Sequence, residues 1–290
     1  MKILVTGSTG QLAGKIRELS GTTNELKFIF ASKDKLDITN TSELHRFFTG
    51  EKIDILINCA AYTNVDGAES TYQQANKVNN FAVKEISRLS ETYNFIFVHI
   101  STDYVFDGSK GRPYKEKDKT NPLGAYGKSK LHGEVSIMEN NCRSIIVRTS
   151  WLYSNLGSNF VKKIINLAQE KESLEVVDDQ LGSPTSAKDL SKAIMHMIRS
   201  KMFIEASSKK EIFHFCNSGV CSWYELAKEI VKIKNLDCKI IPCKSTEIKA
   251  AAKRPFYSAL NSEKFSNSFS FDIKPWQEAL KLSLQDADLN

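Results

Sequence analysis

The sequence predicts an α/β fold, a doubly wound parallel sheet with helices on both faces, together with a smaller second region. Three observations support this prediction. Short apolar runs alternate with longer segments of helical periodicity over the first half of the chain. These runs are apolar throughout, as expected for parallel strands that are covered on both faces. A glycine-rich turn from Gly7 to Gly14 lies between the first strand and the first helix.

The elements can be assigned in order along the chain. The expected strands are rich in β-branched and aromatic residues and cover 2–6, 27–31, 53–59, 95–101 and 144–148. Helical periodicity covers 11–20, 41–48, 72–93 and 123–140. After Trp151 the regular alternation is lost, and helical stretches at 160–169, 188–199 and 223–234 are separated by loops. We therefore predict a first domain over 1–150 and about 174–203, and a second over about 151–173 and 204–290.

Composition and charge are typical of a globular protein with a full core, since 41% of the 290 residues are hydrophobic. The apolar run after Met1 ends at Gly7, too short for a signal peptide, and no later run reaches the length of a membrane span. We therefore expect a cytoplasmic protein without a membrane partner. The net charge of +6 comes from lysines scattered among acids, which argues against nucleic-acid binding. It suits anionic small ligands, and a solvated mixed-charge surface explains it equally well.

The cysteines leave one alternative open. Cys59 lies in an apolar strand, where a reduced thiol packs as a small hydrophobe, and disulfides are not expected. Cys216 with Cys221, and Cys238 with Cys243, form two pairs of equal spacing that are compatible with a four-cysteine zinc site. The spacing is wide for structural zinc, so ordinary packed cysteines are the favoured interpretation.

The turn after the first strand is typical of a dinucleotide-binding site. Gly7 and Gly10 let the backbone approach a pyrophosphate, and the helix that begins at Gln11 supplies amide donors and a favourable dipole. Most Gly-x-x-Gly pairs are plain turns, but the position of this pair after the first strand of a βαβ pattern favours the binding function. Ala13 occupies the third small position, where helix packing tolerates a methyl group.

The end of the second strand bears on the choice of dinucleotide. A classical NAD site places an acidic residue for the ribose hydroxyls at the end of this strand, whereas here the segment 31–35 reads ASKDK. Lys33 or Lys35 can instead face a 2′-phosphate, so the sequence favours NADPH over NADH, and a solvated loop lysine explains either residue equally well. Asp37 and Ile38 are placed to contact the adenine.

The most informative residues follow the fourth strand. Thr102 lies in the run STDYVFDG over 101–108, and Tyr126 and Lys130 project from the same helix face because they are four residues apart. We expect the lysine ammonium to lower the pKa of Tyr126, so that the phenol transfers a proton near neutral pH. The Thr102 hydroxyl can hydrogen-bond a carbonyl oxygen as charge develops during hydride transfer. A Tyr/Lys pair alone is a common surface contact, but the order of these features favours an enzyme.

These segments make the chain resemble the dTDP-4-dehydrorhamnose reductases, within the extended short-chain dehydrogenases, over nearly its whole length. The segments that carry the resemblance are 7–12, 58–66, 101–108, 113–116, 126–134, 148–153, 179–185 and 254–255. The run 101–108 is specific to this branch. The resemblance implies a Rossmann-type dinucleotide domain and a smaller sugar-nucleotide domain. The family usually has glycine where this chain has Ala13.

The resemblance also implies a role for each matching position. Tyr126 would donate a proton, Lys130 would assist it and anchor the cofactor ribose, and Thr102 would bind the substrate carbonyl. The cofactor would be lined by Gly7, Gly10, Gln11, Leu12, Asp37, Ile38, Ala60, Ala61 and Tyr62, together with Tyr126 and Lys130. Asp103, Tyr104 and Trp151 would contact the sugar. Trp151 offers an apolar face for a deoxysugar ring, and a large residue buried between the domains is its alternative.

The implied activity is the NADPH- or NADH-dependent reduction of dTDP-4-dehydro-β-L-rhamnose to dTDP-β-L-rhamnose, for surface polysaccharides. Two alternatives are a reductase of a related 4-keto sugar nucleotide and a non-catalytic, dinucleotide-binding regulatory subunit. The combination of Thr102, Tyr126 and Lys130 argues against the regulatory subunit. Some family members pair through a magnesium site built from glutamates, for which the sequence offers no match. Magnesium dependence and the choice between monomer and homodimer are therefore left open.

Overall fold

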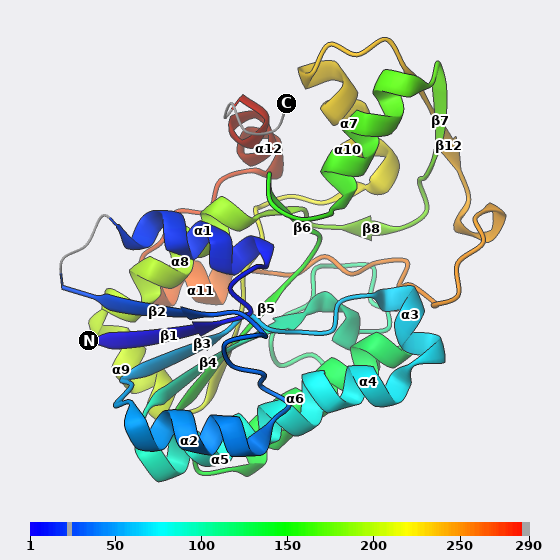
Figure 1. Ribbon diagram of the computed structural model, residues 1–290. Coiled ribbons are helices and arrows are strands. Elements are labelled where there is room, and N and C mark those ends of the chain that lie inside the picture. The colour runs from blue at the N-terminus through cyan, green and yellow to red at the C-terminus, as the bar shows by residue number, and fades with distance from the viewer. Residues whose placement is uncertain (22–24, 286–290) are drawn as a thin grey trace.

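The computed structural model describes residues 1–21 and 25–285, and a six-stranded parallel sheet lies at its centre (Figure 1). Residues 22–24 and 286–290, included in the predicted domains, lie outside the described residues. The strand order is β10-β5-β4-β3-β1-β2, and every neighbouring pair is parallel. The strands are β1 (Lys2–Thr6), β2 (Lys27–Ala31), β3 (Ile55–Asn58), β4 (Ile96–Thr102), β5 (Ser144–Thr149) and β10 (Glu211–His214). The predicted fold class is confirmed.

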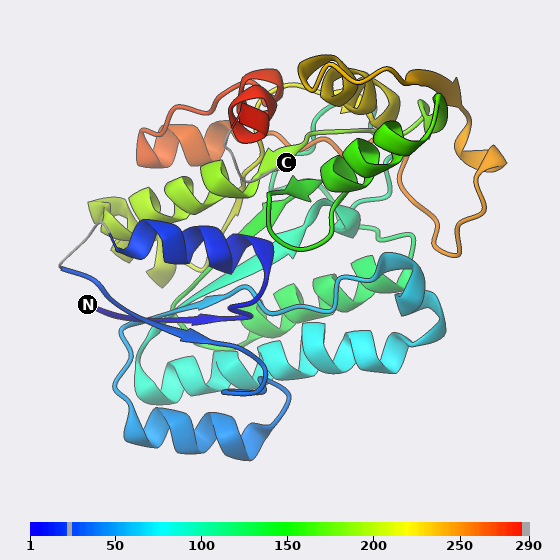
Figure 2. The same ribbon diagram turned by 45° about the horizontal axis from the view of Figure 1, so that its top comes forward.

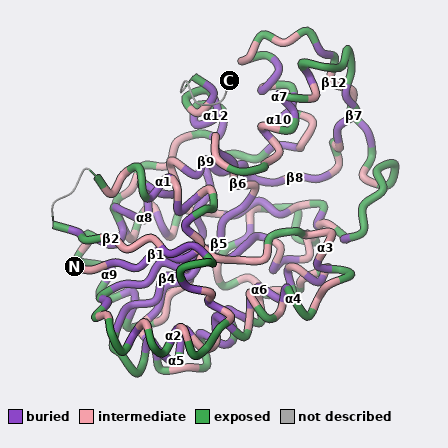
Figure 3. Tube along the Cα trace, viewed as in Figure 1, coloured by how far each residue is buried: buried purple, intermediate pink, exposed green. Residues whose placement is uncertain are grey.

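Both faces of the sheet are buried because successive side chains of a strand point to opposite sides. In β1, Ile3 and Val5 belong to one apolar cluster and Leu4 to the other. In β4, Val98 belongs to the first cluster and Phe97 to the second. Figure 3 shows buried residues concentrated along these strands. This two-sided burial explains why the strands are apolar at every position.

Helices cover each face of the sheet (Figures 1 and 2). One face is covered by α1 (Gln11–Ser20), α8 (Ala187–Arg199), α9 (Lys201–Ser208) and α11 (Glu263–Phe269). The other is covered by α2 (Thr41–Gly50), α5 (Ala82–Tyr93) and α6 (Ala125–Glu139). Asn40 begins α2 by accepting a hydrogen bond from the backbone N–H of Glu43, as expected for an N-cap residue.

The helix predicted over 72–93 is present without a break, but it is not α-helical throughout. It consists of α4 (Tyr72–Asn76), a π-helical turn η1 (Lys77–Phe81) and α5, and it is preceded by the short α3 (Val65–Ser70). A π-helical turn carries an extra residue and is frequent at functional sites. The sequence pattern did not reveal this turn, because both helix types place apolar residues at similar spacing.

A smaller lobe is built around its own apolar cluster. Its helices are α7 (Phe160–Glu170), α10 (Trp223–Ile233) and α12 (Trp276–Gln285), and its longer strands β7 (Ser173–Val177) and β12 (Lys239–Cys243) pair in parallel. Short pairs join β6 (Leu152–Tyr153) to β9 (Thr185–Ser186), and β8 (Leu181–Gly182) to β11 (Cys221–Ser222). Single 3-10 turns are η2 (Asp103–Val105) and η3 (Ser245–Glu247).

The structure differs from the predicted domain boundaries at two strands. We expected about 174–203 to join the first domain, but β7 pairs with β12 of the smaller lobe. We expected 204–290 to belong to the second domain, but β10 forms the edge of the central sheet beside β5. Helix α11 also packs against the central sheet. The chain therefore crosses between the two lobes more often than the loss of alternation after Trp151 indicated.

Candidate active site

A cavity of about 1040 Å³ runs along the carboxyl ends of the central strands and reaches the smaller lobe. Ligands bind at this edge of open α/β sheets, beside the point where the strand order reverses. That point lies between β1 and β3. The predicted site residues that line the cavity are Gly7, Gly10, Gln11, Leu12, Asp37, Ile38, Ala60, Ala61, Tyr62, Thr102, Asp103, Tyr126, Lys130 and Trp151. Tyr104 is the exception and lies outside the lining.

The glycine-rich turn lies against the segment that follows β3. Gly7 has a φ of 65°, and a Cβ atom at this position would lie 2.6 Å from the backbone nitrogen of Ala60. Gly10 is the N-cap of α1, and its N–H donates to the carbonyl of Gly7 at 2.9 Å. Only glycine combines this backbone conformation with this approach. The turn and the N-terminus of α1 therefore fit the pyrophosphate of a dinucleotide.

The loop that follows β6 covers the first turns of α1. The hydroxyl of Ser154 donates to Oε1 of Gln11 at 3.0 Å. A Cβ atom at Gly14 would lie 2.3 Å from Cδ1 of Leu156, so glycine at this position makes room for the loop. Ala13 is fully buried against the sheet, so its methyl group contributes to the core. The departure from the family pattern at Ala13 leaves the turn intact.

The cavity extends past the end of β2, where the adenosine of a dinucleotide would lie. Oδ1 of Asp37 accepts hydrogen bonds from the N–H and the hydroxyl of Thr39 at 2.9 and 2.8 Å. Burial raises the pKa of Asp37, but these bonds and the nearby lysines outweigh it and leave the pKa below its usual value. Of the two lysines that the sequence left open, Lys33 lines the cavity and Lys35 does not. Lys77, from η1, also lines this end.

Asn79 fixes the loop that lines the middle of the cavity. Its Oδ1 accepts a hydrogen bond from the N–H of Tyr62 at 2.9 Å, and its Nδ2 donates to the carbonyl of Tyr62 and the hydroxyl of Ser129. The loop after β3 is thereby tied to α6. Sequence reasoning missed Asn79, although a polar residue within the buried stripe of an amphipathic helix was a usable signal.

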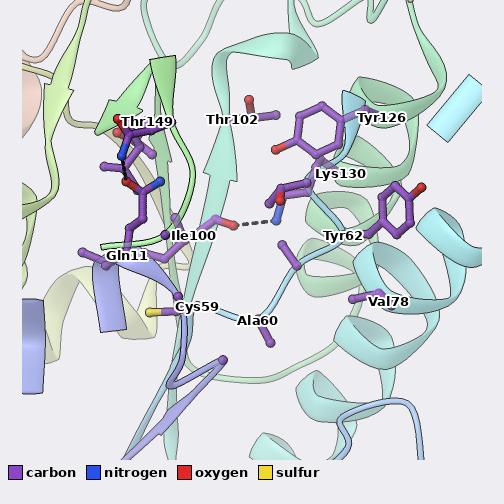
Figure 4. Close-up of a pocket in the computed structure, with 18 of the residues that line it drawn as sticks. Gln11, Cys59, Ala60, Tyr62, Val78, Ile100, Thr102, Tyr126, Lys130 and Thr149 are labelled. Atoms are coloured by element: carbon purple, nitrogen blue, oxygen red, sulfur yellow. Dashed lines mark hydrogen bonds between the residues drawn. The ribbon is translucent and has the colours of Figure 1, made fainter. Parts of the chain in front are cut away.

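Tyr126 and Lys130 project from α6 toward the cavity, and Thr102 lies beside them at the end of β4 (Figure 4). A Cβ atom at Gly127 would lie 2.2 Å from the carbonyl oxygen of Tyr104. Glycine therefore allows α6 to pack directly against the segment that follows β4. This close packing brings together the three side chains that the sequence predicted to act together.

The electrostatic environment of Tyr126 differs from the prediction. Burial raises the pKa of Tyr126 to about 12, and a hydrogen bond with Thr102 offsets this only in part. The Nζ atom of Lys130 instead donates to the carbonyl of Ile100 at 2.6 Å and lies 3.2 Å from Nε2 of His99. The prediction that Lys130 lowers the pKa of Tyr126 is therefore wrong for this structure. A phenol that stays protonated at neutral pH is suited to donate a proton.

Asp103 and Tyr104, which follow β4, differ in their access to the cavity. Asp103 lines the cavity and accepts a hydrogen bond from the hydroxyl of Thr102 at 3.0 Å. The ring of Tyr104 lies edge-on to that of Tyr126, with 5.9 Å between centroids, and its hydroxyl is hydrogen-bonded to Arg254. Asp103 therefore lines the cavity, whereas Tyr104 lies outside the lining, against the ring of Tyr126.

The stability of the protein should depend on pH through Asp103. Burial raises the pKa of this carboxyl to about 7, above its unfolded value of about 3.9. Its contribution to stability is therefore complete below about pH 4 and is lost as the pH rises to about 7. Relative to Asp103→Asn, the wild type should lose about 1.4 kcal/mol of unfolding free energy per pH unit in this window. Urea unfolding at several pH values measures the difference, and a constant difference would contradict the assignment.

Trp151 forms the wall of the cavity at the smaller lobe. Its ring stacks on that of Trp223, with 3.4 Å between centroids and 7° between the ring planes. A Cβ atom at Gly182 would lie 2.4 Å from the Trp151 ring, so this glycine admits the indole. Trp151 is half-buried, packs against the smaller lobe and also lines the cavity. It therefore has features of both alternatives, the packed residue and the residue that faces a ligand. Sequence reasoning missed Trp223, because it lies 72 positions after Trp151 in the chain.

Within residues 1–21 and 25–285, no group of three or more His, Cys, Asp or Glu side chains is placed to hold a metal ion. Cys216 and Cys221 belong to different apolar clusters, so this part of the chain gives no support to the zinc alternative. No helix in the same ranges is long and apolar enough to cross a membrane.

The fold and the cavity together define a class of protein. A parallel sheet, a dinucleotide turn after its first strand, and a Tyr/Lys pair four residues apart beside a strand-end threonine are the features of a short-chain dehydrogenase/reductase. The model of one family, the RmlD substrate binding domain, matches residues 1–289, and the chain belongs to this family.

Known relatives agree with this assignment along the whole chain. A dTDP-4-dehydrorhamnose reductase from Sinorhizobium fredii is 35% identical over 285 residues, which are 97% of this chain and 96% of the relative. The crystal structure of a dTDP-4-dehydrorhamnose reductase from Clostridium acetobutylicum is 39% identical, with a TM-score of 0.91 and 98% of both chains covered. The structure of the Bacillus anthracis enzyme in complex with NADP has the same TM-score and coverage at 35% identity. The predicted family resemblance is confirmed.

Proposed function

We propose that this protein reduces the C4 keto group of dTDP-4-dehydro-β-L-rhamnose to give dTDP-β-L-rhamnose, with NADPH as reductant. The observation that carries the proposal is the continuity of the cavity, which joins the dinucleotide turn at Gly7, the proton donor Tyr126 and the apolar wall at Trp151. The reductases named for this reaction are similar over nearly the whole chain. A cytoplasmic location is part of the proposal, because both substrates are soluble nucleotides.

Each residue has a distinct part in the proposed reaction. The nicotinamide cofactor, when bound, supplies hydride to the carbonyl carbon. The Thr102 hydroxyl, which donates to Asp103 in this structure, would turn to donate its hydrogen bond to the carbonyl oxygen and stabilise the charge that develops there. Tyr126 gives its phenolic proton to the same oxygen, and Lys130 binds the cofactor ribose beside it. The stacked indoles of Trp151 and Trp223 orient the deoxysugar ring.

A preference for NADPH is the finer part of this proposal. Lys33 lines the adenosine end of the cavity with a side chain that is 85% exposed, so its ammonium can meet a 2′-phosphate without a large desolvation cost. Because the contact is exposed, Lys33→Ala should weaken NADPH binding by only about 2- to 5-fold and leave NADH binding unchanged. Fluorescence titration with each cofactor measures both constants. Lys35→Ala is the matched control, and equal losses in the two variants would contradict the assignment.

The proposed function is tested by supplying the substrate directly. dTDP-4-dehydro-β-L-rhamnose, prepared enzymatically, is mixed with the protein and NADPH, and the sugar nucleotide produced is identified by NMR. Formation of dTDP-β-L-rhamnose supports the proposal. Turnover of another 4-keto sugar nucleotide only would shift the assignment to a related reductase, and tight dinucleotide binding without turnover of any keto sugar would favour a regulatory subunit.

A further inference from the structure

A buried histidine lies directly behind Lys130. His99, in β4, is fully buried and follows three buried apolar residues of the same strand. Its Nδ1 atom lies 3.2 Å from Nδ2 of Asn58, and its Nε2 atom lies 3.2 Å from Nζ of Lys130. The proton donor and the substrate-binding residues of the proposed reaction make no use of this ring. A polar chain thus runs from β3 through β4 to the lysine of α6.

The orientation of the Asn58 amide is fixed by two donors. Its Oδ1 accepts a hydrogen bond from the hydroxyl of Thr6 at 2.6 Å and from the backbone N–H of Ala60 at 3.2 Å. A backbone N–H can only donate, so the amide oxygen must be on that side. The Nδ2 group, which also only donates, therefore faces the ring of His99.

This orientation determines the tautomer of His99. Nδ1 must accept the hydrogen bond from Asn58 and therefore carries no proton. Burial lowers the pKa of His99 well below its usual value, so the ring is neutral. A neutral imidazole with a bare Nδ1 carries its proton on Nε2. That N–H points at Nζ of Lys130.

An N–H donor that faces Nζ favours the amine form of Lys130 over the ammonium form. An amine has a lone pair that can accept this bond while one of its own hydrogens is donated to the carbonyl of Ile100. An ammonium group has no lone pair and would meet His99 donor against donor. Burial acts in the same direction and lowers the pKa of Lys130 to about 8.

The other ionisable groups near Lys130 do not reverse this preference. The carboxylate of Glu134 raises the pKa of Lys130, but it is already bound in a bidentate pair by Arg148, at 2.6 and 2.9 Å. Burial keeps the Cys59 thiol protonated by raising its pKa to about 12. The phenol of Tyr126 is held neutral in the same way. His99 is therefore the neighbour whose hydrogen-bonding direction decides between the two forms of Lys130.

We propose that His99, oriented by Asn58, is a positioning residue that stabilises the amine form of Lys130 through its Nε2–H and so lowers the pH at which this lysine changes from ammonium to amine. Protonation of Lys130 breaks this arrangement, since the ammonium form cannot accept the Nε2–H bond. The proposal rests on the proposed role of Lys130 beside Tyr126. Its structural part concerns only protons at His99 and Lys130, so it can be tested without turnover.

The tautomer is tested first, in the wild-type protein. Long-range ¹H–¹⁵N correlation spectra identify which ring nitrogen carries a proton, and His99 should have it on Nε2. His214 is the internal control and should show the opposite tautomer, because its Nε2 faces Arg148 at 3.3 Å and its Nδ1 faces the carbonyl of Tyr114 at 3.0 Å. A proton on Nδ1 of His99, or a doubly protonated ring at neutral pH, would overturn the proposal.

Asn58→Asp then tests the control over Lys130. The carboxylate replaces the donor that faces Nδ1, so His99 should move its proton to Nδ1 and accept a bond from the Lys130 ammonium through Nε2. The titration midpoint of the Lys130 side-chain resonance, assigned by its loss in Lys130→Met, should rise by about one pH unit or more. The corresponding limb of the kcat/KM profile should move with it. A switched tautomer with an unmoved Lys130 midpoint would refute the proposal, whatever the substrate proves to be.

Discussion

Tyr126→Phe is expected to lower kcat for keto-sugar reduction by about 10²- to 10⁴-fold, the contribution typical of a positioned general acid. The half-buried phenol lines the cavity and desolvation raises its pKa to about 12, so at neutral pH it holds the proton that the developing alkoxide needs. Phenylalanine keeps the ring and its edge-on contact with Tyr104 but has no proton to give. Steady-state NADPH oxidation with the 4-keto sugar nucleotide measures the effect.

A matched variant separates proton donation from packing. Tyr104→Phe removes a hydroxyl next to the same ring, but that hydroxyl is hydrogen-bonded to Arg254 and lies outside the cavity lining. Its kcat and its NADPH affinity should both stay within a few-fold of the wild type. If Tyr126→Phe retained most of its kcat, or if both variants lost activity equally, the assignment of Tyr126 as the acid would be refuted.

Arg148→Met is expected to destabilise the fold by about 3–5 kcal/mol, because it leaves a buried carboxylate without its partner. Arg148 and Glu134 are 3% and 2% exposed and form a bidentate pair between β5 and α6. The hydroxyl of Ser101 donates to the same carboxylate at 2.5 Å. The loss should appear as a lower urea midpoint with an unchanged m value.

The double variant Glu134→Leu/Arg148→Met distinguishes charge burial from lost packing. Removing both charges should recover most of the stability lost in the single variant, since no unpaired ion is then buried. Additive losses in the double variant would mean that packing, rather than the ion pair, explains the effect.

Local periodicity was sufficient to predict most of the fold. The strands at 2–6 and 27–31 and the helix at 11–20 have their predicted bounds, because each is specified by the spacing of apolar residues within one contiguous segment. The shared helix face of Tyr126 and Lys130 follows from the same geometry. The glycine-rich turn could also be predicted from the sequence, because the positive φ angle that it requires is at Gly7 itself.

The features of the fold and the site that could not be predicted depend on contacts between segments far apart in the sequence. The pairing of β7 with β12, the position of β10 at the sheet edge and the stack of Trp151 on Trp223 join residues that no local pattern connects. The prediction for the pKa of Tyr126 failed for the same reason. Sequence spacing placed Lys130 on the same face, but only the tertiary structure showed that desolvation raises the pKa of the phenol.

The sequence by itself thus determined the fold class, the dinucleotide turn and the residue types at the site, all of which follow from short-range geometry. Tertiary structure decided the protonation chemistry, because burial and hydrogen-bond direction are set by every element packed around a group. His99 illustrates the difference: in the sequence it is one polar residue in an apolar strand. In the structure, Asn58 fixes its tautomer and it faces Lys130.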